Sequence, residues 1–370
     1  MSVGLTAERE ELARSVGGFL SERSPLTEVR RLMADPTGYD TGIWQQMGRQ
    51  FALQGIAVPE EYGGTGYGYA ELAVVFEQMG KSLLPSPFFA TVALALPALL
   101  AAGDESVLRD FAPGLAAGER IATLAWVEDD CDWRGGTATT ATKAPDGWTL
   151  SGHKAYVIDG SAADLIFVTA EAPAGRSLFA VAGDAPGLTR EAVPSFDQTR
   201  RLARIEFHAT PARLVGEPGR GAEFLAAALD RAAVLLAAEM VGGAQACLDM
   251  SVEYVKQREQ FGRPIGSFQA IKHRCAEILV ELEGARAAAY YGCWAADASP
   301  AELPVVAGIA KATASEAFFR AAGENVQMHG GIGVTWEHDA HLYLKRAKTS
   351  QVLLGDASFH RQRVADLLEL

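Results

Sequence analysis

The sequence predicts an α+β protein. A β-domain, a small barrel or sandwich of short strands, is expected between an N-terminal helical domain and a C-terminal four-helix bundle. Three observations predict this order. Apolar residues recur at helical spacing near the N-terminus, as at Leu12, Val16 and Leu20. Short segments rich in Val, Ile and Thr follow, and alanine-rich helical patterns then run to the C-terminus. We expect domains at 1–118, 119–213 and 214–370.

The helices are predicted from apolar periodicity and from residues that favour helix starts. Thr6 is expected to cap a first helix, since its hydroxyl can accept a hydrogen bond from a free N–H and acidic residues follow it. The nearly all-apolar segment 88–102 is typical of a buried helix. The other helices are expected over residues 43–52, 69–83, 105–115, 224–257, 268–296, 304–326 and 339–353, with a glycine-rich loop at 59–68.

Seven short segments of the central region are predicted as strands, because they are rich in strand-forming residues and are separated by turn signals. They cover residues 121–127, 136–143, 147–150, 155–158, 165–170, 177–182 and 203–207.

Composition excludes several classes of protein. The chain has 370 residues, of which 49% are hydrophobic, so it can bury a large core. Its 33 Lys and Arg against 46 Asp and Glu argue against a nucleic-acid partner. The four cysteines have no metal-binding spacing and are expected to be reduced thiols. A charged N-terminus and the lack of a membrane-length apolar run predict a cytoplasmic protein without membrane association.

A basic corner interrupts the bundle after residue 257. Gly262 and Pro264 break the helical pattern, and Ser267 can cap the helix that follows. Arg258 carries a fork of donors and a helix start offers free N–H groups, so the corner could bind an anion. A solvated turn between two bundle helices is the alternative.

Three stretches carry a family resemblance. Residues 258–277 read RxxFGxPIGxFQxxKHxxAE, which resembles the most recognisable signature of the acyl-CoA dehydrogenase family. VQMHGGIGVTWE at 326–337 resembles that family's other C-terminal signature, and VPEEYGGTGYG at 58–68 resembles its N-terminal one. The resemblance implies a flavoprotein that binds FAD, oxidises the CH–CH bond of an acyl-CoA substrate, and passes electrons to an electron-transfer flavoprotein or a similar acceptor.

In this family each FAD lies across a subunit boundary, and a subunit lends residues to the ADP half of its neighbour's FAD. The residue types of the lent half suit that role here, because a guanidinium binds pyrophosphate, amides bind adenine or ribose edges, and glycine permits close backbone approach. The resemblance assigns the lent half to Arg258, Gln260, Phe261, Gln269, Gln327, Gly330 and Gly331.

The residues that a subunit keeps for its own flavin ring depart from the family pattern. Where the family reads roughly TEPxAGSD, this chain reads VEDDCDW from residue 127, so Val127 replaces a threonine hydroxyl. The family segment WITNG is YVIDG here, so Tyr156 keeps the aromatic ring and Ile158 replaces a second hydroxyl. Each hydrogen bond lost at a buried ring edge costs about 1–3 kcal/mol.

The family's catalytic glutamate, which removes the α proton of the thioester, is also missing. Leu354 occupies its usual position, and Ala232 occupies the place where some members carry the base instead. Helix-end or interface roles are the alternative for each nearby acid. The candidate substitutes are Asp356, Asp230 and Glu239.

A complete lent half with an altered kept half resembles the subunit that lacks the glutamate in bacterial heteromeric acyl-CoA dehydrogenases. We expect an α2β2 heterotetramer with a paralogous subunit that holds the flavin ring and the base. The acyl group is expected to be bulky, such as a steroid side chain. Three alternatives stay open: a self-sufficient homo-oligomeric dehydrogenase that uses Asp356, a flavin-dependent oxygenase, and a flavin-free scaffold of the same fold.

Overall fold

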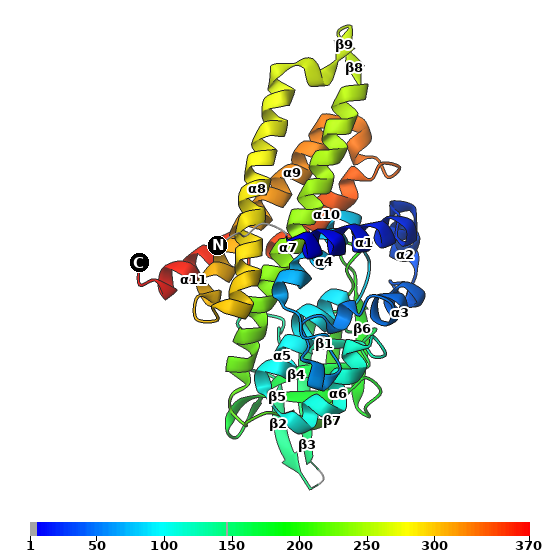
Figure 1. The fold of residues 1–370 in the computed structure, drawn as a ribbon. Helices are drawn as coiled ribbons and strands as arrows, with labels where there is room; N and C mark the ends of the chain where they lie inside the picture. The colour runs from blue at the N-terminus through cyan, green and yellow to red at the C-terminus, as the bar shows by residue number, and fades with distance from the viewer. Residues whose placement is uncertain (1–5, 146) are drawn as a thin grey trace. The chain divides into compact units, whose positions relative to one another are not determined.

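The computed structural model describes residues 6–145 and 147–370 (Figure 1). Contacts divide the chain into two compact units. The first combines the N-terminal segment up to Arg31 with Tyr69–Leu84 and Ala233–Leu370, and the second combines Leu32–Gly68 with Pro85–Ala232. The predicted order of helices, strands and helices is confirmed. The domain limits after residues 118 and 213 stay a prediction, and residues 1–5 lie outside the described ranges.

The first unit is helical. Thr6 caps α1 as predicted, because its hydroxyl accepts a hydrogen bond from the Arg9 N–H at 3.3 Å. The helices of this unit are α1 (Ala7–Arg23), the first part of α2 (Leu26–Ala34), α4 (Tyr69–Ser82), the second part of α7 (Gly221–Gln257), α8 (Gln269–Ala298), α9 (Leu303–His329), α10 (Ala340–Val352) and α11 (Ala357–Leu367). Short connections are β8 (Glu259–Gln260), β9 (Arg263–Pro264), and the 3-10 turns η4 (Ile265–Ser267) and η5 (Gly330–Val334). Among the described residues, no helix combines the length and apolar character that crossing a membrane requires.

Adjacent glycines on α7 allow two helices to approach it closely. A Cβ on Gly242 would lie 1.8 Å from the carbonyl oxygen of Glu77 on α4. A Cβ on Gly243 would lie 2.4 Å from the ring of Phe318 on α9. At the same crossing, a Cβ on Gly80 of α4 would lie 1.9 Å from the carbonyl oxygen of Glu239. The packing of α4 and α9 on α7 therefore requires glycine at these positions.

The second unit contains a closed β-structure. The strand order is β1-β4-β2-β3-β7-β5, and β4 also pairs with β5, so the sheet closes into a small barrel. The strands are β1 (Ala122–Ala125), β2 (Thr140–Ala144), β3 (Gly147–Ile158), β4 (Leu165–Ala172), β5 (Gly175–Ala182), β6 (Leu188–Val193) and β7 (Leu202–Val215). The helical elements of this unit include α3 (Thr41–Arg49), η1 (Leu53–Gly55), η2 (Glu60–Tyr62), the π-helix η3 (Phe89–Ala95), α5 (Leu96–Ala102) and α6 (Glu105–Ala116).

A buried ion pair fixes the loop that follows β1. Lys154 Nζ lies 2.8 Å from Glu128 Oε1, and the two side chains are almost fully buried. Glu128 also accepts hydrogen bonds from the N–H groups of Ala138 and Thr139, at 2.9 and 3.0 Å. Burial alone would raise the pKa of Glu128, but Lys154 and these N–H groups lower it to about 2. The carboxylate is therefore charged at neutral pH and holds residues 128–139 together.

Several local predictions differ from the structure. The two predicted strands at 147–150 and 155–158 form one strand, β3, which continues through two irregularities in its pairing with β7. The expected helix at 88–102 is split into η3 and α5, and Pro97, which has no N–H to donate, stands in the first turn of α5. Ser267 does not cap α8, because η4 includes it and Phe268 precedes the helix. The helices α2 and α11 and the strand β6 were not predicted.

We expect Gly242→Ala to lower the free energy of unfolding by about 1–3 kcal/mol, because α4 must move to admit the added methyl group. Gly18→Ala on α1 is the control, since a Cβ there meets nothing within 4 Å. That change should raise stability by about 0.5–1 kcal/mol. Urea unfolding followed by circular dichroism measures both. Equal stabilities of the two variants would contradict the close helix crossing.

Glu128→Gln should cost about 3–5 kcal/mol of stability at pH 7, because it leaves Lys154 buried without its counter-charge. Glu128→Gln combined with Lys154→Met should recover part of that loss. The folded pKa of Glu128 lies below its ordinary value of 4.5, so the contribution of the pair is complete above that pH and falls as the pH drops toward 2. Denaturant unfolding at pH 7 and pH 3 tests both points. The pair would lose its assigned role if the single variant unfolded like the wild type at pH 7.

Candidate cofactor site

The basic corner forms the end of a helical hairpin in the first unit. The N–H of Arg258 donates to the carbonyl oxygen of Tyr254 at 2.8 Å, and the chain then turns through β8 and β9 (Figure 1). Within the described residues, the exposed guanidinium of Arg258 takes part in no ion pair. The backbone at Phe261 has a φ of 54°, and its side chain is 91% exposed. Gln260 and Gln269 are also exposed.

The second segment predicted to contact FAD follows α9. Gly330 caps this helix with a φ of 64°, and its N–H donates to the carbonyl oxygen of Gln327. Gly330 is therefore the C-cap of α9. Gln327, Gly330 and Gly331 are exposed, and a Cβ at either glycine would meet nothing within 4 Å. The backbone of this loop is open to a ligand.

One ring contact joins the two segments. The ring of Tyr254, one helical turn before Arg258, lies 4.1 Å from the ring of His329, which directly precedes Gly330. The exposed guanidinium, amides and open glycine backbone fit the ADP half of FAD in charge and hydrogen-bonding capacity. Sequence reasoning missed Tyr254 and His329, although both lie within or beside the signatures that it used.

The residues aligned with the flavin-ring contacts do not fit a polar ring edge. The side chains of Val127 and Ile158 are 2% and 1% exposed. The carbonyl oxygen of Val127 accepts from the Ala155 N–H at 2.9 Å, and that of Ile158 accepts from Thr123 Oγ1 at 2.6 Å. Tyr156 is partly exposed, with a φ of 53°. Neither Val127 nor Ile158 offers the hydroxyl found at that position in the family pattern.

Leu354, at the position of the family's base, lies in a tightly held turn between α10 and α11. Its side chain is buried and its φ is 63°, a conformation that costs a leucine free energy. Lys311 Nζ donates to the carbonyl oxygens of Gly355 at 2.9 Å and Gln351 at 3.1 Å. His360 Nε2 lies 3.0 Å from the carbonyl oxygen of Leu354. Burial lowers the pKa of Lys311 to about 7 and that of His360 to about 4.

Sequence reasoning did not predict that Lys311 binds the backbone of the turn that contains Leu354. The available signal was a lysine within an apolar, alanine-rich helix, which requires buried acceptors.

The three candidate substitute bases have different surroundings. Asp356 is exposed and caps α11, accepting the N–H of Phe359 at 2.8 Å. Glu239 is buried on α7 and lies 2.8 Å from Arg346 Nη1. Asp230 is buried on the part of α7 that belongs to the second unit. Their use as bases stays a prediction.

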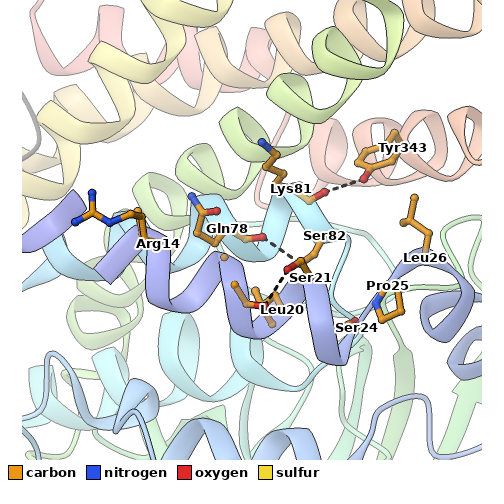
Figure 2. Close-up of a pocket in the computed structure, with 13 residues that line it drawn as sticks. Arg14, Leu20, Ser21, Ser24, Pro25, Leu26, Gln78, Lys81, Ser82 and Tyr343 are labelled. Carbon is orange, nitrogen blue, oxygen red and sulfur yellow. Dashed lines mark hydrogen bonds between the residues drawn. The ribbon is translucent and has the colours of Figure 1, made fainter. Parts of the chain in front are cut away.

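A groove of about 570 Å³ lies on the first unit between α1 and α4 (Figure 2). Gly17, Gly18 and Ser21 line it from α1, and Gln78 and Ser82 line it from α4. At its edge, the Tyr343 hydroxyl donates to the carbonyl oxygen of Lys81 at 2.7 Å (Figure 2). None of the residues predicted to contact FAD lines this groove.

Comparisons with known proteins cover nearly the whole chain. The family described as "Acyl-CoA dehydrogenase, N-terminal domain" matches residues 6–119, and "Acyl-CoA dehydrogenase, C-terminal domain" matches residues 219–368. Acyl-CoA dehydrogenase IpdE2 of Mycobacterium tuberculosis is 39% identical over 94% of this chain and 93% of that protein.

Solved structures agree with these matches. A variant of the "Tcur3481-Tcur3483 steroid ACAD" has a TM-score of 0.89 and 32% identity, over 100% of this chain and 99% of that chain. The ChsE4-ChsE5 complex from Mycobacterium tuberculosis has a TM-score of 0.90 and 28% identity, over 100% and 99%. This chain therefore belongs to the acyl-CoA dehydrogenase family, whose members are FAD-dependent flavoproteins and oxidoreductases acting on CH–CH bonds.

Proposed function

We propose that this chain is the base-lacking subunit of a heteromeric acyl-CoA dehydrogenase and completes the FAD site of a paralogous subunit. One contrast carries the proposal. The residues aligned with the family's lent half are all exposed, and all except Phe261 are polar or glycine. Val127, Ile158 and Leu354, in contrast, place buried apolar side chains where the kept half needs polar groups. A chain that only lends contacts has no need of its own ring contacts or base.

In this proposal the polar residues and the glycines of the lent half have defined tasks. Arg258 holds the pyrophosphate through paired, charge-assisted hydrogen bonds. Gln260, Gln269 and Gln327 bind the edges of the adenosine, and Gly330 and Gly331 let the backbone approach the ligand. When bound, FAD would supply the acceptor for a hydride from the β carbon of the acyl-CoA. The α proton is removed by a carboxylate of the partner subunit, because position 354 here is a leucine.

Exposed surface on α8 supports assembly with a partner. Val280 is 72% exposed and Leu279 is 47% exposed. Gly284, in the middle of the same helix, has nothing within 4 Å of an added Cβ. An exposed glycine inside a helix costs about 0.5–1 kcal/mol relative to alanine. Close approach of another chain at this face would account for both the apolar exposure and the glycine.

A substrate class and partners can be proposed from the similar solved structures. The similarity to a protein described as a steroid ACAD, and to a complex of two named chains, supports a bulky acyl-CoA such as a steroid side-chain thioester and an α2β2 assembly. An electron-transfer flavoprotein or a similar acceptor would reoxidise the flavin. We place the protein in the cytoplasm and retain the three-domain division at residues 118 and 213.

Flavin stoichiometry tests the partnership. Expressed alone, the chain should be flavin-poor and inactive, because no ring site is complete. Co-expressed with its paralogue, it should form an α2β2 assembly with two FAD, one for each ring site of the partner. Native mass spectrometry with flavin absorbance measures both. About one FAD per chain in an assembly of this protein alone would overturn the proposal.

Arg258→Ala in the heteromeric complex should weaken FAD binding about ten- to a hundredfold, since a charge-assisted hydrogen bond contributes about 1.5–3 kcal/mol. Arg263→Ala is the matched control, because the guanidinium of Arg263 lies 4.1 Å from the Phe268 ring within the same corner. FAD retention during dilution distinguishes the two variants. Equal retention would remove Arg258 from the proposed site.

Asp356→Asn tests whether this chain supplies a base. Asparagine can still cap α11, so the fold should be kept. We expect the variant complex to retain FAD and to be bleached by acyl-CoA at the wild-type rate in anaerobic stopped-flow absorbance. Loss of bleaching with FAD still bound would assign the base to Asp356 and refute the base-lacking role.

A further inference from the structure

Three aromatic rings in contact, called the ring stack below, lie near the end of α7, at the end of α9 and in the segment before α10. Both ring pairs are tilted, with interplanar angles of 31° and 48°. The Tyr254 ring on α7 lies 4.1 Å from the His329 ring at the end of α9. The third ring of the stack is that of His338, which lies 4.4 Å from the His329 ring. His329 and His338 flank residues 330–337, so their contact closes this loop at both ends. Gly330 and Gly331 lie inside the loop, and Gln327 lies two residues before His329.

Hydrogen bonds set the proton positions on both histidines. His329 Nδ1 lies 2.8 Å from the carbonyl oxygen of Asn325, so this nitrogen carries a hydrogen. His338 Nδ1 accepts the N–H of Ala340, the first residue of α10, at 3.1 Å, so it carries none. Asp339, which directly precedes α10, makes no side-chain cap to this helix end. Protonating His338 Nδ1 would set two N–H groups against each other and break the hydrogen bond that His338 supplies.

Burial also opposes protonation of His338, while its charged neighbours act in both directions. From α2, Arg30 Nη2 donates to the carbonyl oxygen of His338 at 2.9 Å, and Arg30 Nε lies 2.8 Å from Asp339 Oδ1. Burial lowers the pKa of His338, Asp339 raises it, and His341 and Arg30 lower it. Burial also lowers the pKa of His329, against the hydrogen bond to the Asn325 carbonyl, which raises it. From α10, Lys345 and His341 face Trp336, the lysine 5.1 Å from its ring and the histidine stacked at 5.2 Å. Tyr254 is the titratable group that α7 presents to the stack.

We infer that His329 and His338 form a clasp that positions the 330–337 loop for the ADP half of FAD, and that protonation of His338 opens this clasp. The inference rests on the proposed function for the role of the loop. Three contacts hold the loop in one shape. They are the ring contacts between the neutral histidines, the hydrogen bond from the Ala340 N–H to His338, and the contact of His329 with Tyr254, one turn before Arg258. Arg30 holds the backbone beside His338 in that shape. His338 is thus a positioning residue that does not itself touch the ligand.

The direction of the pH effect on the clasp follows from the lowered pKa of His338 in the closed state. Because the closed clasp binds protons less readily than free histidine, acid favours the open loop. The clasp is complete above the ordinary histidine pKa of 6.5 and is lost as the pH falls through the lowered pKa of His338. Between the ordinary pKa and the lowered pKa of His338, FAD affinity should fall by up to about tenfold per pH unit, because opening takes up one proton over that range.

Two variants distinguish the loss of the hydrogen-bond acceptor at residue 338 from its protonation. His338→Asn keeps an oxygen acceptor for the Ala340 N–H but cannot be protonated in this range, whereas His338→Ala loses the acceptor at every pH. His273→Gln, at an exposed histidine on α8, is the control. In the heteromeric complex, we expect the wild type and His273→Gln to release FAD between pH 7 and pH 5. Retention by His338→Asn should not change between these pH values, because its acceptor cannot be protonated, and His338→Ala should bind FAD weakly at both.

A second measurement needs no flavin. Hydrogen exchange of residues 330–337 in the chain alone should quicken on acidification, after correction for the intrinsic rate, in the wild type but not in His338→Asn. Corrected exchange that is independent of pH in the wild type, or identical in His338→Asn, would overturn the clasp. Exchange could follow the expected pattern while FAD retention does not change with pH. That result would support the clasp but contradict the role of the loop in binding FAD, and with it the proposed function.

Discussion

The direct contact of backbone with backbone where α4 crosses α7 is the constraint on which the helical unit depends. With no side chain at Gly242, α4 lies against α7 closely enough for Glu77 to reach polar groups of α8. Glu77 pairs with Arg286 and accepts a hydrogen bond from the Tyr290 hydroxyl at 2.8 Å. Gly243 sets α9 against the neighbouring face of α7. The ends of α7, α8 and α9, which carry the residues assigned to the cofactor, are thus positioned by packing far from those ends.

Much of this fold is predictable from local sequence patterns. Apolar periodicity predicts α4, α6 and the long bundle helices because each buries one continuous face. It fails where the deciding contact is distant in sequence. The pairing of β4 with β5 that closes the barrel, and the burial of Lys154 against Glu128, leave no periodic signal. Pattern reasoning also missed α2 and α11, which are short, at nine and eleven residues.

The candidate site divides in the same way. Glycine at 330 and the helix break after Gln257 are readable from the sequence, because each reflects a local requirement of the backbone. The roles of Arg258 and Gln327 come from family resemblance, since exposed polar residues have many uses. The ring stack of Tyr254, His329 and His338 could not be predicted, because it depends on how α7, the end of α9 and the segment before α10 come together.

The turn that carries Leu354 owes its shape to other residues. Lys311 and His360 form hydrogen bonds with the carbonyl oxygens of Gly355 and Leu354, respectively. The side chain at position 354 takes no part in these hydrogen bonds. The leucine tolerates a left-handed backbone that costs about 1–3 kcal/mol. The residue at position 354 can therefore change without loss of the contacts that hold the turn. After a gene duplication, one copy could lose its base through a single substitution and still encode a folded subunit able to serve the other.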